Sequence, residues 1–86
     1  MNFSKSRNFE RKIGKLPGKV KKALALRLRI FALDPFNPIL RNHPLRGSMR
    51  NYRSINITGD WRLVYENADG DTVRLIDIDT HSNLYG

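Results

Sequence analysis

The residues of this sequence best suited to moving protons are its two histidines, His43 and His81. An imidazole, with an ordinary pKa of about 6.5, can give or take a proton near neutral pH. Cleavage of RNA without a metal needs such groups, because a base must deprotonate the 2′-hydroxyl and an acid must protonate the leaving 5′-oxygen. The alternative interpretation is structural: His43 is simply exposed in a loop before Pro44, and His81 balances the acids of the preceding strand.

Four further residues have side chains that suit contacts to a nucleotide: Asp60, Trp61, Arg62 and Tyr85. The fork of an arginine matches two phosphate oxygens, and the rings of Trp61 and Tyr85 can stack on an unpaired base. Each of these residues also has a purely structural interpretation. Asp60 after a glycine is common in turns, Trp61 can belong to the core, Arg62 can pair across strands, and Tyr85 can cover a sheet edge.

Basic charge is the feature that points to a class of partner. The formal net charge is +8 and the pI is about 10.5, and ten basic residues stand against one acid in residues 1–30. Such a surface attracts polyanions, so nucleic acid is the leading partner, although a solvated lysine-rich helix is the plainer explanation. Arginines in the middle of the chain are further candidates for RNA contacts: Arg41, Arg46, Arg50 and Arg53.

Several classes of protein are disfavoured by what the sequence lacks. It has no cysteine, no phosphate-binding glycine loop and no HExxH motif, so we expect neither a metal nor a cofactor. No apolar run approaches the length of about 20 residues that a membrane span requires, and the first residues do not resemble a signal peptide. We therefore expect a cytoplasmic protein with no membrane partner.

Two helices are expected in the first third of the chain. The first is capped by Ser4 or Ser6, and the second begins at Pro17, which suits a first helical turn. The second helix should end at Asp34-Pro35, because the residue before a proline avoids the α region. Apolar residues recur at helical spacing in both segments: Phe9, Ile13 and Leu16, then Val20, Leu24, Leu28 and Phe31.

The rest of the chain has the pattern of an antiparallel meander. Three strands are expected: residues 52–57, 61–66 and 72–78. Turns separate them at Thr58-Gly59 and at residues 67–70. A further strand from residues 1–4 or 43–47 is not placed by the pattern. We therefore predict one α+β domain over residues 1–86, with two N-terminal helices packed on one face of a small antiparallel sheet and the other face open to a ligand.

Four short motifs, in register over about half of the chain, resemble the YafQ-like branch of the RelE superfamily of toxin–antitoxin ribonucleases. They are NHPLRG at residues 42–47, YR at 52–53, DWRLVY at 60–65 and THSNLYG at 80–86. The resemblance implies a RelE-like fold with a curved sheet. It also implies a metal-independent endoribonuclease that cuts messenger RNA in the ribosomal A site by 2′-hydroxyl attack. Its partners would be that messenger, ribosomal RNA and a cognate antitoxin protein.

The resemblance also assigns roles to single residues. His81 would be the main general acid or base, and His43 would lie near the scissile phosphate with Asp60 in support. Arg62 would hold phosphate, while Trp61 and Tyr85 would lie against the nucleotide.

This sequence departs from the family pattern at three positions. The family has a histidine where this chain has Asn56, and a catalytic arginine is replaced by Asp77; Asp79 stands where a glycine is usual. Two carboxylates near a phosphate site oppose substrate binding, so weakened activity stays open. Two other functions stay open as well: a toxin of the same fold that acts on DNA gyrase, as the ParE toxins do, and a basic RNA-binding module without catalysis.

Overall fold

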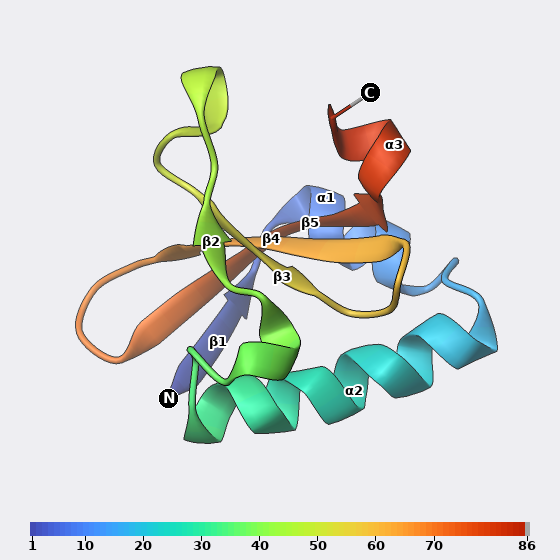
Figure 1. Cartoon of the computed structure of the whole chain (residues 1–86), viewed down its shortest axis with the longest axis horizontal. Coiled ribbons are helices and arrows are strands. Elements are labelled where there is room, and N and C mark those ends of the chain that lie inside the picture. The colour runs from blue at the N-terminus through green and yellow to red at the C-terminus, as the bar shows by residue number, and fades with distance from the viewer. Residues whose placement is uncertain (86) are drawn as a thin grey trace.

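The computed structural model describes residues 1–85 and places five strands in one mixed sheet, in the order β1-β5-β4-β3-β2 (Figure 1). The strands are β1 (Asn2–Lys5), β2 (His43–Pro44), β3 (Arg53–Asn56), β4 (Trp61–Asn67) and β5 (Thr72–Thr80). The helices are α1 (Arg7–Ile13), α2 (Gly18–Leu33) and α3 (His81–Tyr85), with short 3-10 helices η1 (Pro38–Leu40) and η2 (Gly47–Met49). The predicted α+β class is confirmed, and so are the three central strands.

One edge of the sheet contradicts the prediction of a fully antiparallel arrangement. β1 pairs with β5 in parallel, from Asn2 opposite Thr72 to Lys5 opposite Leu75. The prediction was wrong because this pairing joins the two ends of the chain, and no local pattern reports such a contact. The pairs β2–β3, β3–β4 and β4–β5 are antiparallel.

The helices begin and end close to the expected residues. Ser6 caps α1, since its hydroxyl accepts a hydrogen bond from the Phe9 N–H at 3.0 Å and donates to the Ile76 carbonyl at 2.6 Å. The same side chain thereby ties α1 to β5. Pro17 precedes α2 as its N-cap instead of lying in its first turn, and α2 ends at Leu33, followed by the C-cap Asp34, whose backbone is extended.

A single apolar cluster joins the helices to the sheet. Phe9 of α1 and Phe31 of α2 are almost completely buried with Ile55, Tyr65 and other strand residues. The Phe31 ring meets the Tyr65 ring edge to face, with ring centroids 4.8 Å apart. In Figure 1, α2 runs along the lower side of the sheet in this view, and α3 stands above the end of β5.

The sequence pattern did not place two short elements at the candidate site: it left a strand within residues 43–47 open, and it gave no helix after the last strand. His43 lies in the two-residue strand β2, not in a loop, and pairs with Ser54 of β3. His81 and Tyr85 lie on the helix α3, which follows β5 directly. Gly86, the last residue of the fourth motif, lies outside the described residues. Among residues 1–85, no helix has the length and apolar character needed to cross a membrane.

Candidate functional site

A groove of about 260 Å³ brings the two histidines together. One wall is the segment from His43 to Arg46, which contains β2, and the other wall is formed by His81 and Tyr85 of α3. Figure 1 shows these two elements facing each other across the top of the sheet. Residues far apart in the sequence therefore line one open surface that combines two imidazoles, a guanidinium and a phenol.

His81 is positioned by the backbone of the turn before β4. Its N–H donates to the Asp60 carbonyl at 2.8 Å, which fixes the first turn of α3 against the β3–β4 connection. The imidazole packs edge to face on the Tyr85 ring, with centroids 4.9 Å apart. Both side chains are exposed. Asp60 is exposed as well, and it contacts His81 through its backbone carbonyl.

The tautomer of His43 follows from its hydrogen bond. Its Nδ1 lies 2.8 Å from the Arg41 carbonyl oxygen. Since a carbonyl can only accept, the hydrogen of the neutral ring is assigned to Nδ1. Nε2 then carries the free lone pair, and this is the arrangement that a general base requires.

Trp61 lies outside the histidine groove. It is half-buried against the core, and it lines a separate hollow of about 180 Å³ with Lys12, Lys15 and Asp79.

Arg62 also lies away from the histidines. Its Nη1 donates to the carbonyls of Thr58 and Gly59 at 3.1 and 3.2 Å. Its side chain lines a third hollow together with Arg27 and Arg41. Trp61 and Arg62 point to different hollows because neighbouring residues of a strand face opposite sides of the sheet.

The remaining predicted arginines divide between the groove and its surroundings. Arg46 lines the histidine groove. Arg50 is exposed just after η2. Arg53 has a structural role, since its Nε donates to Asn42 Oδ1 at 2.8 Å and its guanidinium lies 5.4 Å from the centre of the Phe36 ring.

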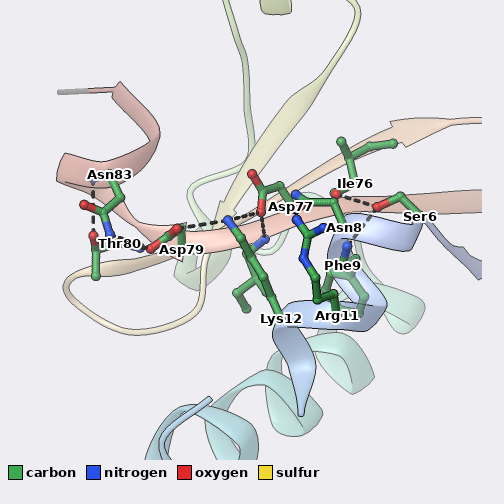
Figure 2. A network of polar contacts seen from close by, with 11 residues as sticks. Ser6, Asn8, Phe9, Arg11, Lys12, Ile76, Asp77, Asp79, Thr80 and Asn83 are labelled. Carbon is green, nitrogen blue, oxygen red and sulfur yellow. Dashed lines mark hydrogen bonds and ion pairs between the residues drawn. The ribbon is translucent and has the colours of Figure 1, made fainter. Parts of the chain in front are cut away.

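Asp77 and Asp79 are both paired by Lys12, which no motif distinguishes from the other basic residues of the first thirty. The Lys12 ammonium lies 2.8 Å from Asp77 and 3.0 Å from Asp79, and all three side chains are largely covered (Figure 2). The ammonium offsets part of the negative charge that we expected to oppose RNA. No local pattern marks Lys12, because its partners are on the last strand.

The same network determines how α3 starts. Oδ1 of Asp79 accepts hydrogen bonds from the Thr80 N–H at 2.8 Å and from the Asn83 side chain at 2.9 Å, as Figure 2 shows. Lys12 thus acts through Asp79 on the helix that carries His81.

The pKa values of Lys12 and Asp79 reflect this pairing. Burial acts to raise the pKa of Asp79, but hydrogen bonds from Asn83, Lys12 and Thr80 and the charge of Lys12 outweigh it, so the pKa is lowered. Burial likewise acts to lower the pKa of Lys12, and the two carboxylates outweigh it, so that pKa is raised.

The structure also bears on metal binding. In residues 1–85 no group of three histidine, cysteine or acidic side chains is arranged to hold a metal ion.

Comparisons with known proteins point to one family. A family model described as "Bacterial toxin of type II toxin-antitoxin system, YafQ" matches residues 1–86. The mRNA interferase toxin YafQ of Escherichia coli K12 is 35% identical over 52 residues, which are 60% of this chain and 55% of that protein. The match therefore spans little more than half the length of that curated relative.

Solved structures agree in fold over nearly the whole chain. The crystal structure of YafQ from Escherichia coli BL21(DE3) superposes with a TM-score of 0.81 at 22% identity, over 99% of this chain and 98% of that one. The toxin chain in the Escherichia coli DinJ–YafQ toxin–antitoxin complex gives a TM-score of 0.72 at 26% identity, over 99% and 97% of the two chains.

Proposed function

The chain belongs to the YafQ family of bacterial toxins of type II toxin–antitoxin systems, and on this basis we propose that it is a ribosome-dependent endoribonuclease that cuts messenger RNA without a metal. The observation that carries the proposal is the groove that His43 and His81 line together with Arg46 and Tyr85. Two imidazoles in one open groove can supply the base and the acid that cleavage next to a 2′-hydroxyl requires.

In the proposed reaction His43 is the base and His81 the acid. Nε2 of His43 takes the proton of the 2′-hydroxyl, and the resulting oxygen attacks the adjacent phosphorus. The bond from phosphorus to the 5′-oxygen breaks, and His81 protonates that oxygen as it leaves. The products are a 2′,3′-cyclic phosphate and a 5′-hydroxyl end. The Arg46 guanidinium, in the same groove, stabilises the charge that develops on the phosphate oxygens.

The other candidate residues have supporting roles in this proposal. Tyr85 packs on His81 and offers a ring to the nucleotide. Asp60 orients His81 through its backbone carbonyl. Contacts to ribosomal RNA come from Arg41 and Arg50 outside the groove, while Arg53, which the motif also singled out, holds Asn42 and stacks on Phe36.

We also propose which face of the sheet is open to RNA and which protein partner the chain binds. Both helices share one buried cluster with the strands, and we infer that they cover one face of the sheet and leave the groove side to RNA. A relative was solved as the DinJ–YafQ toxin–antitoxin complex, which supports a cognate antitoxin as the protein partner. The place of action is then the cytoplasm, where translating ribosomes are found.

The test is a translation reaction on a defined messenger, with cuts mapped by primer extension. The proposal predicts in-frame cuts when ribosomes are present, and no cuts of the same RNA when it is free and EDTA has been added. The ribosome reaction must keep its magnesium, because ribosomes need it. Damage to DNA in cells with intact messenger would instead indicate a gyrase-directed toxin, and RNA binding without any cut would indicate a simple binding module.

A further inference from the structure

A carboxylate that this chain has in place of the usual glycine, Asp79, bonds to a side chain of the helix α3. The Asn83 side-chain amide donates to Oδ1 of Asp79 at 2.9 Å, and Oδ2 lies 3.0 Å from the Lys12 ammonium. Figure 2 shows this chain of contacts from Asn83 through Asp79 to Lys12. A glycine at this position would have no side chain to accept either contact, so the link between α3 and the rest of the fold depends on the carboxylate.

The helix α3 is held by polar contacts and not by burial. None of its five side chains, all within the described residues, is buried, and isolated helices shorter than about 12 residues are marginal in water. Two further hydrogen bonds hold its first turn, from the His81 N–H to the Asp60 carbonyl at 2.8 Å and from the Asn83 N–H to Thr80 Oγ1 at 3.3 Å. Asn83 therefore contacts the end of β5 through both its backbone and its side chain.

Asn83 and His81 project from opposite sides of α3. Each residue of an α-helix is turned by about 100° from the one before, so two residues differ by about 200°. Tyr85 comes four residues after His81 and returns to the same side, where the two rings pack with centroids 4.9 Å apart. One side of α3 is thus bonded to Asp79 of β5, while the other side presents His81 and Tyr85 to the groove.

We propose that Asp79 and Asn83 are positioning residues, whose hydrogen bond holds α3 in the orientation that keeps His81 and Tyr85 in the groove. That this orientation serves RNA cleavage rests on the proposed function. Asp79 then supports the reaction, whereas a carboxylate that acts only through its charge would oppose the binding of RNA. The two interpretations predict opposite effects when the carboxylate is removed.

The first test compares Asp79→Ala with Asp69→Ala, since Asp69 is an exposed carboxylate in the turn between β4 and β5. Both changes remove one negative charge, so any general gain in attraction for RNA is shared. Alanine is used because glycine would itself loosen the backbone. In single-turnover cleavage at saturating ribosomes, Asp79→Ala should be about tenfold slower than Asp69→Ala, with a similar half-saturating ribosome concentration. A rate equal to or above that of Asp69→Ala would overturn the proposal.

The second test removes the donor and leaves the Lys12 ion pairs in place. Asn83→Ala should also cut about tenfold more slowly, with a melting temperature near wild type because α3 has no buried side chain. Asn67→Ala, at the exposed last residue of β4, is the control and should keep the wild-type rate. Asn83→Gln keeps the carboxamide and should recover part of the loss.

A double variant tests whether the two residues act through one bond. Asp79→Ala combined with Asn83→Ala should be no slower than Asp79→Ala alone, because both changes break the same hydrogen bond. Two effects that multiply in the double variant would overturn the pairing.

Amide hydrogen exchange of the protein without RNA separates failure of this inference from failure of the proposed function. Asn83→Ala should speed exchange of the His81 N–H about tenfold and leave that of Leu63, in the central strand β4, unchanged. If the wild-type protein cuts no messenger but this change in exchange is seen, the positioning of α3 stands and the nuclease falls. If messenger is cut and Asn83→Ala equals Asn67→Ala in both rate and exchange, the nuclease stands and the positioning role falls.

Discussion

His81→Ala is expected to reduce messenger cleavage on the ribosome by at least about a hundredfold, because it removes the group that protonates the leaving oxygen. The measurement is the initial rate of cleavage of one mapped site under single-turnover conditions. His81→Gln should be equally impaired, since glutamine keeps a polar side chain but cannot transfer a proton at neutral pH.

Ser82→Ala is the matched control for His81→Ala, because Ser82 is the exposed neighbour of His81 on α3 and does not line the groove. Its cleavage rate should stay close to wild type. Melting temperatures near wild type in all three variants would show that α3 remains folded. A His81→Ala rate equal to that of Ser82→Ala would remove His81 from the chemistry.

Lys12→Met is expected to lower the free energy of unfolding at neutral pH by about 2 kcal/mol. The substitution leaves Asp77 and Asp79 without their ammonium partner in a largely covered position. For a domain of this size the melting temperature should fall by about 10 °C. Lys19→Met removes an exposed lysine of α2 and should change the free energy by less than about 0.5 kcal/mol. Equal melting temperatures for the two variants would contradict the role of the network.

The loss of free energy of unfolding in Lys12→Met should depend on pH, and the pKa shifts of Asp79 and Lys12 give its direction. The folded-state pKa of Asp79 is lowered, so its contribution is present above its unfolded pKa of about 3.9 and is lost as pH falls through the lower folded value. The pKa of Lys12 is raised, so its contribution is present below about 10.4 and is lost as pH rises through the higher folded value. The gap between wild type and Lys12→Met should be widest between about pH 5 and 10.

The sequence predicted the ends of the helices correctly, because a helix cap and a proline act only on neighbouring residues. Ser6 fits the cap of α1, and Asp34 ends α2 before a proline. The parallel pairing of β1 with β5 was missed because it depends on a contact between the two ends of the chain. α3 was missed because five residues are too few to show a helical repeat.

The candidate site likewise contains residues that the sequence identified and one residue that it could not identify. The resemblance singled out His43, His81 and Tyr85, and these side chains do line one groove. Strand alternation alone could have separated Trp61 from Arg62, because neighbouring residues of β4 face opposite sides of the sheet. Lys12 could not have been identified from the sequence, since its role depends on the packing of α1 against β5.

The central claim is that this groove cuts RNA through its own 2′-hydroxyl, and one substrate change tests it directly. A messenger with a single 2′-deoxy nucleotide on the 5′ side of a mapped cut is compared with the unmodified messenger on the same ribosomes. We predict no cut at the modified position, and a 2′,3′-cyclic phosphate on the upstream fragment of the unmodified messenger. Equal cleavage of both messengers would contradict the account.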